Sequence, residues 1–99
     1  MEIIKTHDGS IGVLSLTGRL DTVTAPKLQA ALEELMPEAE QIELNFSAIE
    51  YVSSAGLRIL LMGQKNAQAS GKSMVLKHVP AKVLEVFEIT GFSSILTIR

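Results

Sequence analysis

The chain of 99 residues has no cysteine and no tryptophan, and only four residues are aromatic. The missing cysteine excludes disulfides, thiolate metal ligands and a cysteine nucleophile, and it fits a reducing compartment. No apolar run approaches the ~20 residues that span a bilayer, since the longest covers residues 59–62 only. The amino terminus lacks a basic stretch followed by an apolar one. We therefore expect a cytoplasmic protein with no secretion signal and no membrane insertion.

The chain also lacks a large excess of charge of one sign, because nine basic and eleven acidic residues give a net charge of −2. The balance is uneven: residues 1–50 sum to −6 and residues 51–99 to +4. Nucleic-acid binders usually carry a dense basic patch with aromatic residues between the charges. Such a patch is absent, so we expect no nucleic-acid partner. Solubility and a polarised protein-binding surface both explain the asymmetry.

The composition is that of a small globular protein, with 46% hydrophobic and 20% charged residues, and a chain of this size holds one core. We expect a single domain over residues 1–99. Asp8-Gly9 between two apolar runs predicts a β-hairpin. Apolar residues at helical spacing predict a first helix, with Thr24 as its cap, Pro26 in its first turn and Pro37 at its end.

Further along, alternation predicts a strand at residues 42–46, a short segment that ends at residues 51–52, a strand at 74–76 and a last strand at 95–98. Between them lie a second helix from about Ser53 to Ala69 and a third that opens at Pro80 and closes at Gly91. Strands separated by helices imply right-handed parallel crossovers. The prediction is an α/β fold: a mixed four- to five-stranded sheet of order strand–strand–helix–strand–helix–strand–helix–strand, with the helices packed against it.

The passage from strand into second helix, Tyr51-Val52-Ser53-Ser54-Ala55-Gly56-Leu57-Arg58, is the unusual local feature. A helix start has unpaired amide hydrogens and a partial positive charge, so it accepts a phosphate readily. Two serines followed by very small residues are open to modification there. Serine is also a favoured helix cap, and this plainer reading stays open.

Four stretches occur in order: Gly18-Arg19-Leu20-Asp21, residues 42–47 (IELNFS), residues 51–57 and residues 80–92 (PAKVLEVFEITGF). Together they resemble the STAS-domain family, and within it the small bacterial anti-sigma factor antagonists. The resemblance covers essentially the whole chain. It implies a partner switch rather than an enzyme, with no catalytic residue, cofactor or metal. The unphosphorylated antagonist binds an anti-sigma factor that is also a serine kinase, and phosphorylation releases it. A serine phosphatase resets the monomeric antagonist.

The family's Asp-Ser-x-Gly motif places the phosphorylated residue at Ser54 of this chain. The motif's acidic residue is replaced by Ser53, which is the second candidate, and Asn45 stands where many relatives have aspartate. Arg58, one turn after Ser54, is placed to meet the phosphate or the partner, and Met62 shares its arc of the helix. The residues expected to bind the partner are Asp21, Thr22, Ser53, Ser54, Ala55, Gly56, Arg58 and Met62.

Three other functions compete with the partner switch. A serine hydrolase needs Gly-x-Ser-x-Gly and a histidine base. Residue 52, where the motif has its first glycine, is valine, and the sequence indicates no acidic partner for His7 or His78. A nucleotide-binding module would carry a phosphate-binding glycine motif, and none is present. The remaining alternative is a STAS accessory subunit of a membrane lipid transporter, which would bind an ATPase component without a phospho-switch.

Overall fold

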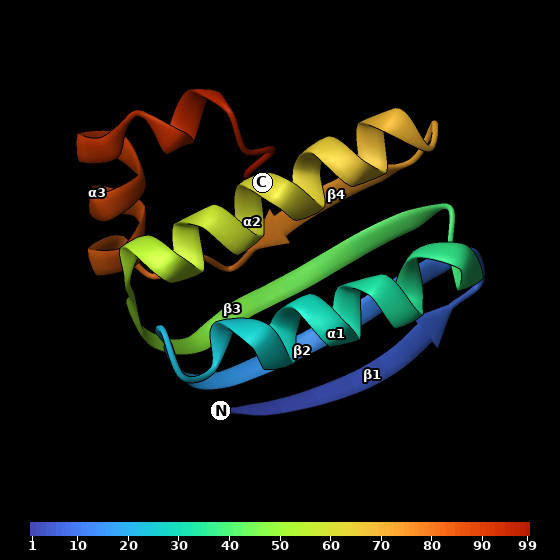
Figure 1. Ribbon diagram of the computed structural model, residues 1–99, viewed down its shortest axis with the longest axis horizontal. Helices are drawn as coiled ribbons and strands as arrows, with labels where there is room; N and C mark the ends of the chain where they lie inside the picture. Colours follow the sequence, from blue (N-terminus) through green and yellow to red (C-terminus); the bar gives the residue numbers. More distant parts are fainter.

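The computed structural model describes residues 1–99 and contains one mixed four-stranded sheet of order β1-β2-β3-β4 (Figure 1). The elements are β1 (Glu2–Asp8), β2 (Ile11–Leu20), α1 (Ala25–Leu35), β3 (Gln41–Val52), α2 (Ser54–Ala69), β4 (Ser73–Lys77) and α3 (Ala81–Thr90), with short 3-10 helices at Met36–Glu38 and Phe92–Ser94. The predicted mixed α/β architecture is thus confirmed. No helix is both long and apolar enough to cross a membrane.

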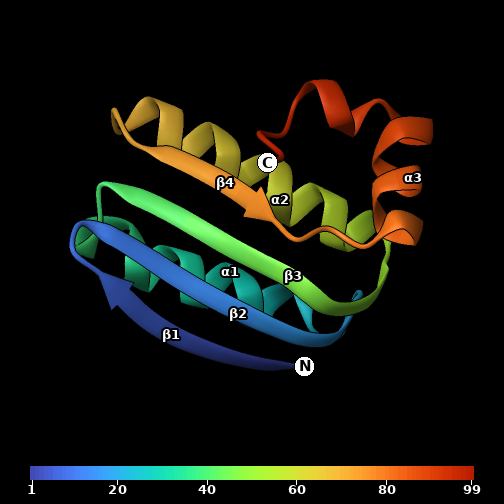
Figure 2. The same cartoon turned by 180° about the vertical axis from the view of Figure 1, so that it is seen from behind.

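The sheet begins with the predicted hairpin and continues with parallel strands. β1 pairs antiparallel with β2, and Gly9 in the connecting turn has a φ of 62°, which suits glycine. β2 pairs with β3, and β3 with β4, in parallel. Helices α1 and α2 lie side by side over one face of this sheet, and the opposite face carries no helix (Figure 2).

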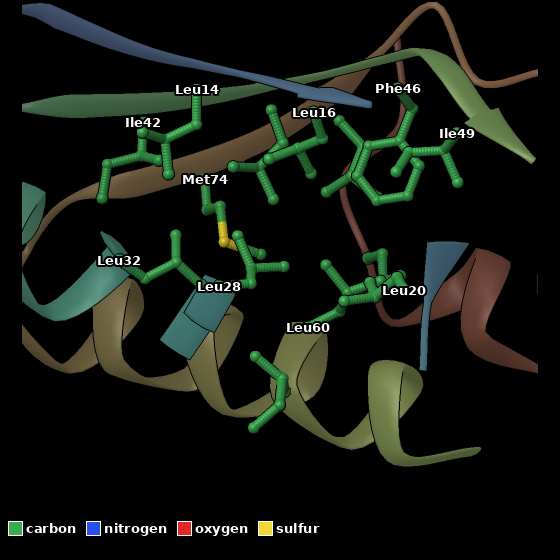
Figure 3. Packing of buried hydrophobic residues seen from close by; sticks show 14 of the residues in the cluster. Leu14, Leu16, Leu20, Leu28, Leu32, Ile42, Phe46, Ile49, Leu60 and Met74 are labelled. Carbon is green, nitrogen blue, oxygen red and sulfur yellow. The ribbon is translucent and has the colours of Figure 1, made fainter. Parts of the chain in front are cut away.

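The core lies between that face and the two helices. Alternate residues of β2 point into it, because Leu14 and Leu16 are buried while their neighbours are not. Figure 3 shows side chains from β2, β3 and β4 converging on those from α1 and α2. At the α3 end, Phe46 and Phe87 pack edge to face with ring centroids 6.2 Å apart. One cluster of 22 buried residues therefore supports every element that positions the carboxyl edge of the parallel strands.

β3 is a single strand of 12 residues, so the prediction of a strand at 42–46 followed by a separate short segment was wrong. Residues 47–50 (SAIE) continue the strand, with Ile49 buried in the core and the other three side chains exposed. The backbone there is irregular: Asn45 Oδ1 accepts a hydrogen bond from the Ser47 amide at 3.0 Å. The β2–β3 register also shifts twice, between Ser15 and Thr17 and between Gly18 and Arg19.

The last predicted strand, at residues 95–98, is reduced to an isolated parallel bridge between Leu76 and Ile98. Leu76 N donates to Thr97 O at 2.8 Å, and Arg99 N donates to Leu76 O at 2.9 Å. Residues 95–98 do not form a longer strand, because a 3-10 helix follows Gly91 and Leu96 is then buried in the core. α3 behaves as predicted: it opens after Pro80 and ends at Gly91, whose φ is 80°.

Candidate functional site

The carboxyl ends of β2 and β3 meet at one edge of the sheet. Leu20 is paired with Val52, and the next amide, Ser53 N, donates to Leu20 O at 2.8 Å. Asp21 and Ser53 leave these strands at the same edge, as expected for neighbouring parallel strands. The structure therefore brings the Asp21–Thr24 loop next to the start of α2.

At the start of α2 the two serines have different roles. Ser53 has extended backbone angles, with φ −89° and ψ 174°, and its hydroxyl accepts a hydrogen bond from Gly56 N at 3.3 Å. Ser53 is therefore the helix cap. Ser54 is the first residue of the helix and is exposed. Its hydroxyl is not the capping group, so it is accessible to a modifying enzyme.

Gly56 explains why α2 can begin so close to the strand ends. A Cβ atom at this position would lie 2.7 Å from Leu20 Cγ and 2.9 Å from the Leu20 carbonyl oxygen. It would also meet Val52 Cγ1 at 3.1 Å. The carbonyl is backbone and cannot move aside, so any larger residue would displace the helix start. The small residues of this stretch thus serve packing as well as access to Ser54.

The loop before α1 is organised by a carboxylate. Asp21 Oδ1 accepts hydrogen bonds from Val23 N at 3.0 Å and from Thr24 N at 3.1 Å. Thr24 occupies the N-cap position of α1, as predicted from the sequence, but its side chain makes no capping bond to the amides that follow. Instead its hydroxyl accepts from Asp21 N at 2.9 Å and donates to Arg19 O at 2.7 Å. The hydrogen bonds from Thr24 and Val23, together with the nearby Arg19 charge, lower the pKa of Asp21.

Sequence reasoning missed three residues beside this edge. The Arg19 guanidinium lies 4.3 Å above the centre of the Tyr51 ring, and its Nε is 3.7 Å from Asp21 Oδ2. Val23 is 85% exposed and Tyr51 is 43% exposed. An apolar valine within a run of polar loop residues was the available signal for Val23. The sequence contained no signal for the Arg19–Tyr51 contact, because this contact depends on the register between β2 and β3.

Arg58 and Met62 project from the outer arc of α2, as the helical spacing predicted. Arg58 is exposed and follows Ser54 by one turn. Met62, one turn further, is 39% exposed. Thr22 is also exposed, whereas Ala55 is half-buried and Gly56 is buried. The exposed members of the predicted set are thus Thr22, Ser54, Arg58 and Met62. Gly56 is buried and allows the start of α2 to pack closely against Leu20.

The two histidines lie away from this edge. His7 pairs with Gly12 in β2, eight residues before Leu20, which corresponds to about 26 Å along a strand. Its Nε2 lies 3.7 Å from Glu38 Oε1, so the expectation that it has no acidic neighbour was wrong. His78 is exposed beyond β4. β4 pairs with β3 only as far as Asn45, so it stops well short of Ser53. A serine–histidine pair is therefore not assembled.

The fold and the sequence together define the class of protein. A sequence model described as "Mlab, STAS domain" matches residues 4–97. The chain belongs to the STAS-domain family.

Within that family the chain is similar to anti-sigma factor antagonists. BtrV of Bordetella bronchiseptica is 34% identical over 92 residues, which are 92% of this chain and 78% of that protein. The anti-sigma-B factor antagonist of Listeria monocytogenes is 29% identical over 97 residues, or 97% of this chain and 85% of that protein. The anti-sigma factor antagonist SpoIIAA in its unphosphorylated form has the same fold, with a TM-score of 0.82 at 18% identity over 99% of this chain and 88% of SpoIIAA.

Proposed function

We propose that this chain is an anti-sigma factor antagonist that works by partner switching. Relatives that align over most of their length carry that name, and the solved structures with this fold include SpoIIAA in unphosphorylated and phosphorylated forms. In this proposal the unphosphorylated chain binds an anti-sigma factor that is also a serine kinase. Phosphorylation then releases it, and a serine phosphatase restores it. The chain acts as a cytoplasmic monomer and catalyses no reaction itself.

The single observation that carries the phosphorylation site is the division of labour between Ser53 and Ser54. The Ser53 hydroxyl is half-buried and holds the Gly56 amide, so modifying it would break the helix cap. Ser54 is exposed at the first position of α2 and is followed by Ala55 and Gly56. A kinase active site must enclose the accepting hydroxyl, and the exposed Ser54 offers more access than the half-buried Ser53. Ser53 is the second choice.

A physical magnitude supports the switch. A phosphate on Ser54 adds about −1.5 to −2 charges at neutral pH, beside a surface that includes Thr22, Arg58 and Met62. A partner shaped to the neutral hydroxyl would then bury an imperfectly paired dianion. Mispairing of a buried interfacial charge costs roughly 2–5 kcal/mol. This cost corresponds to a loss in affinity of about 30-fold to several thousand-fold, so the domain need not refold to change partners.

Phosphorylation in vitro followed by peptide mass spectrometry tests the proposal. The chain is incubated with its cognate anti-sigma factor kinase and ATP, and the modified peptide is sequenced. The expected result is one phosphate on Ser54. A phosphate found only outside Ser53 and Ser54 would show that the site is wrong. Absence of any complex between the chain and the kinase would remove the function itself.

A second candidate function is a STAS accessory subunit that binds the ATPase component of a membrane lipid transporter. This second function is supported by the description of the matching family, which names Mlab rather than an antagonist. The two functions differ in how they respond to charge at Ser54. An accessory subunit would bind its ATPase equally well as the wild type and as Ser54→Asp, whereas an antagonist would lose its kinase. Comparing both variants against both partners separates them.

A further inference from the structure

A groove of about 310 Å³ lies between α1 and α2, outside the Ser54 edge. The two helices run side by side on the same face of the sheet (Figure 1). The apolar side chains along this groove include Met36 after α1, and Ile59 and Met62 of α2. Because Met62 is 39% exposed, the groove opens on the same arc of α2 that carries Arg58.

One carboxylate sets the charge of the groove. Glu33 is the only charged residue that lines it, and its Oε1 accepts a hydrogen bond from Gln29 Nε2 at 3.2 Å. Glu33 takes part in no ion pair, whereas the neighbouring Glu34 and Glu38 are both paired with Lys5. An apolar slot beside an unpaired carboxylate is complementary to an apolar side chain with a cation next to it.

The groove is continuous with the row of residues that begins at Ser54. Ser54, Arg58 and Met62 are spaced four residues apart, so each step advances about 6 Å along α2 and turns the helix face by about 40°. Met62 ends the row and also lines the groove. Ser54 and Met62 are separated by about 12 Å along the helix. One partner can cover both residues, because each protein contributes roughly 800 Å² of surface to an ordinary interface.

We propose that this groove receives one large apolar side chain, next to a lysine or arginine, of the same anti-sigma factor kinase that binds at Ser54. This inference rests on the proposed function. The groove then acts as an anchor that does not respond to phosphorylation, because about 12 Å of helix exceeds the screening length of ~8 Å at physiological salt. Sites that far apart usually contribute additively to the binding free energy when they contact different residues of the partner. Loss of the anchor therefore weakens both phosphorylation states by the same factor.

The four methionines provide a direct readout. Met36 and Met62 line the groove, whereas Met1 and Met74 do not. The chain is labelled with ¹³C at the methionine methyl groups and titrated with unlabelled kinase. We expect the Met36 and Met62 signals to shift or broaden while the Met1 signal does not. Met36 is the deciding probe, because Met62 would respond to a contact confined to the outer arc of α2. The same shifts produced by concentrating the chain alone would assign the groove to a second copy and overturn the proposal.

A charge reversal at the rim completes the test. Glu33→Lys should weaken kinase binding by about tenfold, and by the same factor in the Ser54→Asp background. Glu40→Lys is the matched control, since Glu40 is exposed before β3 and does not line the groove. Circular dichroism confirms that each variant is folded. If Met36 is silent and Glu33→Lys binds normally while Ser54→Asp still weakens binding, the anchor is wrong and the proposed function stands. If the wild type does not bind the kinase, both are wrong.

Discussion

Two helices begin at the same edge of the sheet, and a different side chain organises the backbone at each start. In the turn that leads into α1, the Asp21 carboxylate accepts from the amides of Val23 and Thr24 at 3.0 and 3.1 Å, just before the first helical residue, Ala25. At α2 the capping group is the neutral Ser53 hydroxyl, which accepts from Gly56 N at 3.3 Å. The start of α1 therefore holds a fixed negative charge, and the start of α2 holds none.

The comparison explains where a switch can be placed. A helix start favours negative charge by typically 0.3–1 kcal/mol at an exposed site, and at α1 that charge is permanent. At α2 a negative charge can be added by modification of the exposed hydroxyl of Ser54. A partner that covers this edge would meet one anion before phosphorylation and a dianion in addition afterwards. The asymmetry between the two starts is what gives the modification its effect.

The largest effect that we expect is the loss of phosphate uptake in Ser54→Ala. The capping bond of Ser53 is intact in this variant, so it should fold and still bind the kinase within about tenfold of the wild type. Incorporation of phosphate is measured by intact mass after incubation with kinase and ATP, and Ser53→Ala serves as the matched control. Full phosphorylation of Ser54→Ala, together with none of Ser53→Ala, would exchange the roles of the two serines.

A second effect concerns packing at α2, where the backbone contact has no counterpart at α1. Gly56→Val should lower the free energy of unfolding by about 1–3 kcal/mol, because the added carbons meet the Leu20 side chain and carbonyl. Urea denaturation measures this change. Gln68→Val on the exposed side of the same helix is the control and should change stability by less than about 0.5 kcal/mol. Equal effects in the two variants would contradict the close approach.

Substitutions at the cap of α2 make the two helix starts either more similar or less similar to each other. Ser53→Ala removes the hydroxyl that holds Gly56 N and should lower the free energy of unfolding by about 1 kcal/mol. Ser53→Asp places a carboxylate there, as at α1, and should raise it by about 0.3–1 kcal/mol. Thermal melts at low salt compare the three chains. A destabilised Ser53→Asp would mean that this start does not accept negative charge.

The smallest effect is expected from Asp21→Asn, because the amide keeps an oxygen acceptor in place of the carboxylate. The hydrogen bonds from Thr24 and Val23 lower the pKa of Asp21 from its ordinary 3.8. A lowered folded-state pKa adds stability above pH 3.8 that is lost as the pH falls through the folded-state value. The urea midpoint of Asp21→Asn should therefore lie slightly below that of the wild type at pH 7, and the two should converge in acid. A constant difference between pH 7 and pH 2 would contradict this account.

Much of this edge could be predicted from the sequence, because its determinants are local. Ser53 and Ser54 lie at a strand-to-helix junction that periodicity locates, and parallel strands necessarily bring Asp21 to the same edge. Thr24 is the N-cap residue of α1, as predicted, but its hydroxyl bonds the Asp21 amide and the Arg19 carbonyl instead of a helix amide. A propensity for capping locates the cap residue, whereas the loop geometry decides which groups its hydroxyl bonds.

The errors elsewhere arise from tertiary context. Residues 47–50 of β3 (SAIE) do not alternate between apolar and polar, yet pairing with β2 keeps them extended. The last strand had the apolar pattern but not the conformation, because Leu96 is drawn into the core. The Arg19–Tyr51 contact and the groove between α1 and α2 both depend on registers and helix spacings that no local pattern contains.

Isothermal titration of one kinase preparation with the unphosphorylated chain and with the chain phosphorylated on Ser54 tests the central claim most directly. The claim is that a dianion at the start of α2 makes docking unfavourable. We predict that the phosphorylated chain binds at least about 30-fold more weakly, as expected for a mispaired charge in an interface. Equal dissociation constants for the two forms would contradict the switch.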